Sequence, residues 1–155
     1  MIEVQRIAQE SQREVRDVVR GYREIDLEAE LSGARGVLRA AGIDCEVSGE
    51  TGGLPTEVQS ALGWVVREAT TNVLRHSGAR SVTVELALTE DGATLTVTDD
   101  GRGPTGGNGA GLAGLAERVA ALGGTVETGA APGRGFRLRA VVPVPASAPT
   151  GVAAP

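Results

Sequence analysis

The spacing of apolar residues along this 155-residue chain predicts helices that alternate with strands. Apolar positions three and four residues apart indicate amphipathic helices, whereas strict alternation indicates strands with one buried face. We predict helices over residues 2–22, 26–42, 55–77 and 110–123, a strand over 43–49, and hairpins over 80–101 and 125–144. This order of elements favours an α/β domain.

The first predicted helix, residues 2–22, has an apolar seam with the spacing of a coiled coil. The seam consists of Val4, Ala8, Ser11, Val15, Val18 and Tyr22. Two interpretations have equal weight. The helix either pairs with a partner helix that the chain does not contain, or it packs on its own domain.

Short local signals define where the other elements begin and turn. Asp26 is a typical N-cap for the second helix. Pro55 and the pattern Thr56-x-x-Gln59 predict a capping box at the start of the third helix. The Asp91-Gly92 pair predicts the turn of the first hairpin.

A polar edge runs along the third helix beside its apolar face. The apolar face consists of Val58, Leu62, Val65, Val66, Ala69 and Val73, and the edge consists of Glu68, Asn72, Arg75 and His76. A carboxylate and an amide one turn apart can hold a divalent cation, because hard cations prefer oxygen ligands. A solvated edge with side-chain pairs at helical spacing explains the same residues, and for this helix alone it is the stronger interpretation.

Two glycine motifs follow the first hairpin. The first is D-x-G-x-G at Asp99, Gly101 and Gly103, and the second is G-x-G-x-G at Gly107, Gly109 and Gly111. Glycines before a helix let backbone N–H groups approach phosphates, and a carboxylate at a strand end can accept a hydrogen bond from an exocyclic amine such as that of adenine. A glycine-rich loop alone is usually a flexible connection. Here the loop follows a polar-edged helix and a hairpin, and it precedes a further helix. This order of elements favours a nucleotide site.

Composition excludes several classes of function. The net charge of −5 argues against a nucleic-acid partner. All fifteen basic residues are arginine, so a Walker loop, which needs lysine, is excluded. A Rossmann fingerprint is excluded as well, because its glycines precede the acid, whereas here the acid comes first.

The remaining composition bears on redox chemistry and location. Cys45 is the single cysteine, which excludes an internal disulfide and a cysteine zinc site, and we expect it to be a small buried residue. No apolar run approaches the roughly 20 residues that span a membrane. We therefore expect a cytoplasmic chain without membrane contact, whether or not a longer parent protein spans the inner membrane.

Taken in order, these motifs resemble those of the ATP-binding domain of sensor histidine kinases, in the superfamily that also holds DNA gyrase B, Hsp90 and MutL. "REATTNVLRHSGA" resembles the N box, "DDGRG" the first glycine box, and "GNGAGLAGLAERVAALGG" the second. Within that family the chain is similar to the subfamily of the nitrate- and lipid-fluidity-sensing two-component kinases.

The resemblance implies a Bergerat fold, which is a two-layer α/β sandwich. Its sheet is mixed and mainly antiparallel, with helices on one face. The implied domains are an ATP-binding catalytic domain over 25–144, the end of the second dimerisation helix over 1–24, and a disordered tail over 145–155.

The resemblance also implies roles for the residues of the polar edge. Asn72 would coordinate the Mg²⁺ that bridges the ATP phosphates. Glu68 would orient or activate the nucleophile and would also be a ligand of the metal. Arg75 and His76 would contact phosphate or ribose.

Further implied roles fall on the glycine boxes. Asp99 would bind the adenine amine, with Gly101 and Gly103 allowing the base to sit close. Gly107, Gly109 and Gly111 would form the hinge and phosphate-binding end of an ATP lid. Leu112, which follows them, would also bind ATP. There is no separate phenylalanine box, since the only phenylalanine is Phe136 in the last hairpin. We therefore expect small aliphatic residues to pack on the adenine.

The family transfers the γ-phosphate of ATP to a histidine on a dimerisation helix and then to a response regulator. The only histidine here is His76, which lies in the N box, so we expect Mg-ATP binding without autophosphorylation of this chain. Two alternatives stay open: a protein-serine kinase of the anti-sigma-factor type in the same superfamily, and a nucleotide-binding module without catalysis.

Overall fold

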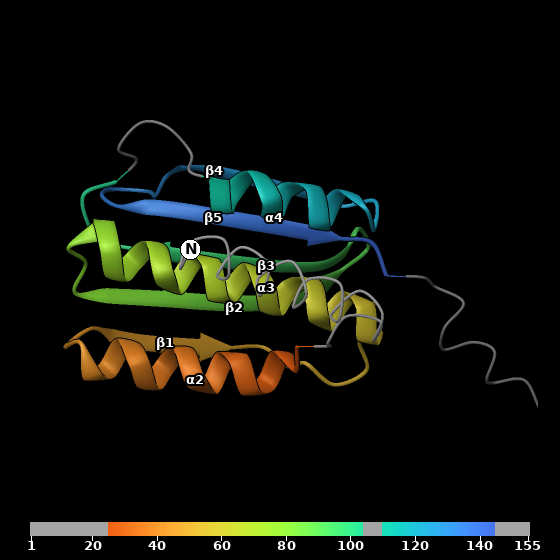
Figure 1. Cartoon of the computed structure of the whole chain (residues 1–155), viewed down its shortest axis with the longest axis horizontal. Helices are drawn as coiled ribbons and strands as arrows, with labels where there is room; N and C mark the ends of the chain where they lie inside the picture. Colours follow the sequence, from red (N-terminus) through yellow and green to blue (C-terminus); the bar gives the residue numbers. More distant parts are fainter. Residues whose placement is uncertain (1–24, 104–109, 145–155) are drawn as a thin grey trace, which may run out of the picture.

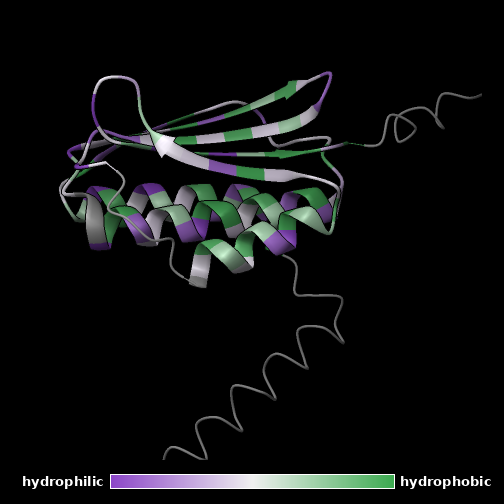
Figure 2. Cartoon of the chain, turned by 90° about the horizontal axis from the view of Figure 1, so that it is seen from above, coloured by the Kyte–Doolittle hydropathy of each residue, from purple (hydrophilic) through white to green (hydrophobic). Residues whose placement is uncertain are grey.

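The computed structural model describes residues 25–103 and 110–144, apart from the side chains of His76, Ser77 and Ala110. The predictions for 1–24, for the glycines at 107 and 109, and for 145–155 lie outside the described residues. In the described part, α2 (Leu27–Ala40), α3 (Thr56–Asn72) and α4 (Ala110–Ala120) lie on one face of a sheet (Figures 1 and 2). None of these described helices is long and apolar enough to cross a membrane.

The sheet has five strands in the order β1-β2-β3-β5-β4. Their bounds are β1 Asp44–Ser48, β2 Ser81–Thr89, β3 Gly92–Asp99, β4 Thr125–Ala130 and β5 Phe136–Val142. β1 runs parallel to β2, and the other neighbouring pairs are antiparallel. The predicted two-layer sandwich with a mixed, mainly antiparallel sheet is confirmed.

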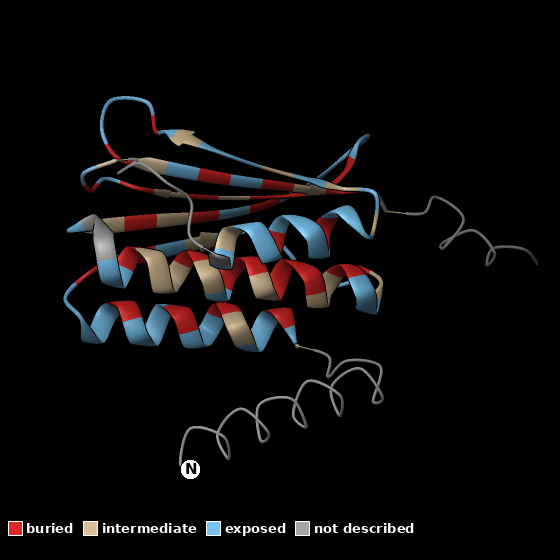
Figure 3. Cartoon of the chain, turned by 45° about the horizontal axis from the view of Figure 1, so that its top comes forward, coloured by how far each residue is buried: buried red, intermediate tan, exposed pale blue. Residues whose placement is uncertain are grey.

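The core lies between the helices and the sheet, as the buried positions in Figure 3 show. All six residues of the predicted apolar face of α3 are buried, and so is Cys45. Alternate residues of the central strands face the helices and are also buried: Val82, Val84, Leu86, Leu95, Val97, Leu138, Ala140 and Val142. The period of the apolar pattern therefore identified the buried face of each of these elements.

The helix starts agree with the sequence signals in one case and differ in the other. The Asp26 carboxylate accepts a hydrogen bond from the Glu28 backbone N–H at 3.1 Å, which confirms this N-cap. The predicted capping box of α3 is wrong. Pro55 is the N-cap residue, no side chain caps this end, and the Gln59 amide instead donates to the Leu54 carbonyl at 3.0 Å.

The first hairpin turns one residue earlier than predicted. Thr89 and Gly92 are paired across the two strands, so Glu90 and Asp91 form the loop. Gly92 is the first residue of β3 and has a φ of 121°, which favours glycine.

α3 also ends differently from the prediction of one α-helix reaching Ser77. The α-helix ends at Asn72, and a π-helical turn, η1, covers Val73–Ser77. Gly78 then ends the segment in the left-handed conformation. Because a π turn holds more residues than an α turn, positions after Asn72 do not continue the angular spacing of the helix before them.

The three α-helices are also linked across their outer surface. Two guanidinium groups lie over the Trp64 ring of α3, that of Arg67 at 4.8 Å and that of Arg118 at 4.5 Å from the ring centroid. Arg67 in turn makes two hydrogen bonds, of 3.0 and 3.2 Å, to the Glu30 carboxylate of α2. Arg118 belongs to α4, so α4 is attached to α3 by this contact.

The burial of the core predicts different losses of stability for the same leucine-to-alanine change at a buried and at an exposed position. Leu62 has no exposed surface, whereas Leu88 on β2 is 61% exposed. We expect Leu62→Ala to lower the free energy of unfolding by about 2–5 kcal/mol, because it removes buried methyl groups and leaves a cavity. Leu88→Ala should change it by less than about 0.5 kcal/mol. Denaturant unfolding measures both, and equal effects would contradict the assignment of the core.

Candidate functional site

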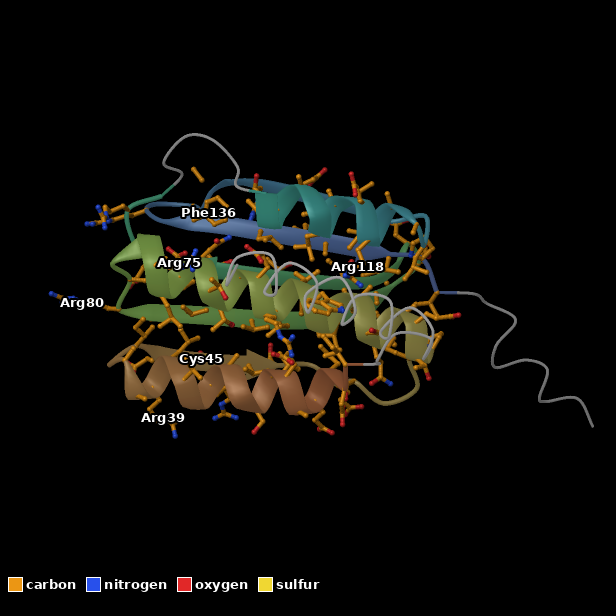
Figure 4. All side chains as sticks on the ribbon, in the orientation of Figure 1. Arg39, Cys45, Arg75, Arg80, Arg118 and Phe136 are labelled. Atoms are coloured by element: carbon orange, nitrogen blue, oxygen red, sulfur yellow. The ribbon has the colours of Figure 1, made fainter. Side chains whose placement is uncertain are left out.

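Several of the predicted site residues that the structure describes lie at one end of the sheet. β3 ends there at Asp99, and β5 begins there with Phe136, which is paired with Asp99 across the two strands. Figure 4 shows Arg75 and Phe136 at this end, while Arg80 extends away from the molecule. The end of α3 with η1 and the beginning of α4 lie over it (Figure 1).

Asp99 is buried, with 5% of its surface exposed, and its carboxylate has a set orientation. Its Oδ1 atom accepts a hydrogen bond of 2.8 Å from the Gly101 backbone N–H. Its Oδ2 atom has no hydrogen bond to the described residues. Every fully buried side-chain oxygen in the described part has a hydrogen-bond partner, so Oδ2, which has none, is not fully buried. Oδ2 is therefore open to a ligand that donates a hydrogen bond.

The neighbouring residue, Asp100, joins the end of β3 to the start of β2. Its Oδ1 accepts hydrogen bonds from the backbone N–H groups of Arg80 and Ser81, at 2.8 and 3.0 Å, and its Oδ2 accepts one from the Ser81 hydroxyl at 3.1 Å. The backbone donors of Ser81 and Arg80 stabilise the charged form and lower the pKa of Asp100 from its ordinary value of 3.8.

The turn between β4 and β5 packs against the backbone of the first glycine box. A side chain at Gly135 would collide with the Asp99 carbonyl oxygen, and a Cβ atom at Gly103 would lie 3.2 Å from the Gly135 carbonyl oxygen. The Arg134 Nε atom donates a hydrogen bond of 3.0 Å to the Gly101 carbonyl. Sequence reasoning missed Arg134 and Gly135, although the Gly133-Arg134-Gly135 turn was a signal for a close approach.

The polar edge of α3 meets the beginning of α4. Glu68 and Asn72 lie one turn apart and are both half-buried. The Glu68 carboxylate lies against Gly111, where any side-chain carbon would collide with it. The structure thus brings Glu68 next to the second glycine box.

The rest of the predicted edge is not continuous with this pair. Arg75 belongs to the π turn and is exposed, and the side chain of His76 lies outside the described part. Arg102, inside the first glycine box, has its guanidinium over Gly78, 3.7 Å from where a Cβ atom would be. Sequence reasoning did not select Arg102, which supplies a further cation at this end.

The donor atoms bear on which metal this site suits. Glu68 and Asn72 offer oxygen ligands, which Mg²⁺ prefers. Within residues 25–103 and 110–144, no group of three or more His, Cys, Asp or Glu side chains could hold a metal ion. A Mg²⁺ ion at Glu68 and Asn72 would need oxygen ligands from a bound phosphate or water, as is usual for this ion.

The second glycine box is described only in part. Gly111 lies in the first turn of α4 and is exposed, and Leu112 is half-buried and packs against the core. Backbone N–H groups at a helix start attract anions. The beginning of α4 can therefore approach a phosphate beside Glu68.

Comparison with known proteins identifies similar sequences. The family described as histidine kinase-, DNA gyrase B-, and HSP90-like ATPase matches residues 57–146. The sensor histidine kinase LnrJ of Bacillus subtilis is 36% identical over 103 residues, covering 64% of this chain and 26% of LnrJ. The sensor histidine kinase LiaS of the same organism is 30% identical over 151 residues, covering 91% of this chain and 42% of LiaS. The chain spans less than half the length of these two relatives.

Solved structures show the same fold at lower identity. The histidine kinase domain of the blue-light activated histidine kinase from Erythrobacter litoralis superposes with a TM-score of 0.66 at 22% identity, covering 83% of this chain and 63% of that one. The ATP binding domain of PrrB from Mycobacterium tuberculosis superposes with a TM-score of 0.60 at 23% identity, covering 80% of this chain and 98% of that one.

Asp100 predicts a pH-dependent contribution to stability. Because its pKa is lower in the folded protein, the carboxylate stabilises the fold above pH 3.8, and this contribution is lost as the pH falls through the folded-state pKa. We expect Asp100→Asn to lower the free energy of unfolding by about 1 kcal/mol at pH 7, with a smaller loss below pH 3.8. Urea unfolding across this range measures the difference.

A matched control is Asp91→Asn, which changes an exposed aspartate in the loop of the first hairpin. It should leave the pH dependence close to that of the unmutated chain. A destabilisation by Asp100→Asn that is the same at both pH values would contradict a charged role for this residue.

Proposed function

Because the chain belongs to the family of histidine kinase-, DNA gyrase B-, and HSP90-like ATPases, which provides an ATP-binding domain, we propose that it is the Mg-ATP-binding catalytic domain of a two-component sensor histidine kinase. The observation that carries the proposal is the buried carboxylate of Asp99, one oxygen of which accepts a hydrogen bond from the Gly101 N–H while the other stays open. Sensor histidine kinases among the relatives favour this class over the protein-serine kinase alternative.

In this proposal, Asp99 recognises the base. Its open Oδ2 atom accepts a hydrogen bond from the exocyclic amine of adenine, and its buried surroundings strengthen that bond. Gly101 and Gly103 carry no side chain that would keep the base away. The hydrogen bond from Arg134 to Gly101 and the contact at Gly135 keep this loop in place.

The triphosphate lies between α3 and the beginning of α4. Asn72 and Glu68 would hold Mg²⁺, whose charge would neutralise the phosphate oxygens. Arg75 and His76 contact phosphate or ribose. Gly107, Gly109 and Gly111 would form the hinge and phosphate-binding end of the ATP lid, and Leu112 would contact the ATP.

Phosphoryl transfer depends mainly on positioning and on neutralising charge around an in-line nucleophile. Glu68 orients or activates that nucleophile. The nucleophile is a histidine of the parent kinase's dimerisation helices, because His76 belongs to the nucleotide site. The phosphate then passes to a response regulator, with no nucleic acid involved.

The proposal includes the domain organisation. In this proposal the catalytic domain covers residues 25–144, and residues 1–24 belong to the end of the second dimerisation helix. We place this domain in the cytoplasm, where ATP and the response regulator are available.

Isothermal titration calorimetry tests the nucleotide site. We expect the unmutated chain to bind Mg-ATP with a micromolar Kd. Asp99→Asn replaces the acceptor oxygen with a donor, and Asn72→Ala removes the metal ligand. Each should weaken binding by about 2 kcal/mol or more, roughly thirtyfold in Kd.

Two further substitutions serve as controls. Asp91→Asn makes the same chemical change far from the site, and Thr71→Ala truncates the residue next to Asn72 on α3. Both should keep the Kd of the unmutated chain. An unmutated chain that binds no nucleotide would refute the proposal.

A second experiment tests the target of the phosphate. We expect labelled ATP to leave this chain unlabelled and to label an added pair of dimerisation helices that contains a histidine, because the chain lacks the accepting residue. The linkage should be labile in acid, as phosphohistidine is. Labelling of a serine-bearing antagonist protein instead would show the protein-serine kinase activity, and labelling of His76 would contradict its assigned role.

A further inference from the structure

Phe136 is the only phenylalanine in the chain, and the structure places it next to the buried carboxylate. It is the first residue of β5 and is directly opposite Asp99 in the β3–β5 register. Residues directly opposite in an antiparallel pair have Cβ atoms about 5 Å apart and on the same face of the sheet. The sequence pattern alone had set this residue aside as part of the last hairpin.

Both residues face the helix side of the sheet. Leu138, Ala140 and Val142 follow Phe136 at two-residue intervals and are all buried under the helices. Asp99 continues the buried series of Leu95 and Val97 on β3 in the same way. The Phe136 ring therefore lies in the layer that holds the Asp99 carboxylate.

The ring is only half-buried. It packs against the core yet keeps exposed surface. Figure 4 shows it at the end of the sheet. The approach of Gly135 to the Asp99 carbonyl holds the start of β5 against β3. The apolar ring is thus held beside an open hydrogen-bond acceptor.

A flat heteroaromatic ring with an exocyclic amine matches this pair of groups. The amine donates to the Asp99 Oδ2 atom, and the ring gains apolar contact with the phenyl group. We propose that Phe136 forms the apolar wall of the nucleotide-base pocket and contacts the adenine directly. This inference rests on the proposed function, and it replaces the expectation that small aliphatic residues alone pack on the base.

The single phenylalanine allows a direct test by nuclear magnetic resonance. In a chain that is deuterated except for its phenylalanine ring, the aromatic proton signals come from Phe136 and from the added nucleotide only. With Mg²⁺ and a non-hydrolysable ATP analogue, we expect nuclear Overhauser effects between this ring and the adenine C–H protons. If these effects are absent from a complex saturated with the analogue, the proposed contact between Phe136 and the adenine is refuted, while the proposed function is not.

Calorimetry with variants provides the second measurement. Phe136→Thr should weaken ATP binding about tenfold, because the variant loses the aromatic contact with the base. Phe136→Leu, which keeps an apolar side chain, should lose less. Val141→Thr is the matched control, since Val141 is also half-buried on β5 but lies on the face away from the helices, and it should bind as the unmutated chain does.

The outcomes separate the two proposals. Binding of ATP by the unmutated chain together with an equal Kd for Phe136→Thr would refute the wall alone. No binding by the unmutated chain would refute both proposals. The nuclear Overhauser effects are measured on the unmutated chain, so the test stands even if a substitution at Phe136 impairs folding.

Discussion

The packing of α3 against the centre of the sheet is the interaction on which the rest of the structure depends. Its apolar face is buried on β3 and β5, so the helix cannot rotate without exposing Leu62 and Val65, which have no exposed surface. The direction of the polar edge follows from that constraint. Glu68 and Asn72 are therefore presented to the start of α4 by the same packing that stabilises the domain.

Close backbone contacts and hydrogen bonds fix the positions of the residues at this end of the sheet. Gly135 touches the backbone of Asp99, and the Arg134 side chain holds the Gly101 carbonyl. Asp100 ties the same end of β3 to β2 through three hydrogen bonds. A buried carboxylate needs such support, because a small displacement would cost it its hydrogen bond without a replacement from water.

α4 is connected to the site more lightly than α3. Among the side chains of α4 that the structure describes, only Leu115 and Val119 are buried. The helix contacts α3 through Glu68 at Gly111 and through Arg118 over Trp64. The group proposed to orient the nucleophile therefore touches the helix that follows the glycine-rich loop. Movement of α4 would change the surroundings of Glu68 directly.

The sequence by itself determined the elements, the layer architecture and the local motifs, because apolar periodicity and glycine positions act over short stretches of chain. It placed Asp99 at a strand end and Glu68 beside Asn72 on one helix. Only the tertiary structure decided which distant groups meet, namely Phe136 and Arg134 at the first glycine box and Glu68 at the second. Strand register, helix contacts and the π turn after Asn72 arise from long-range packing, which no local pattern encodes.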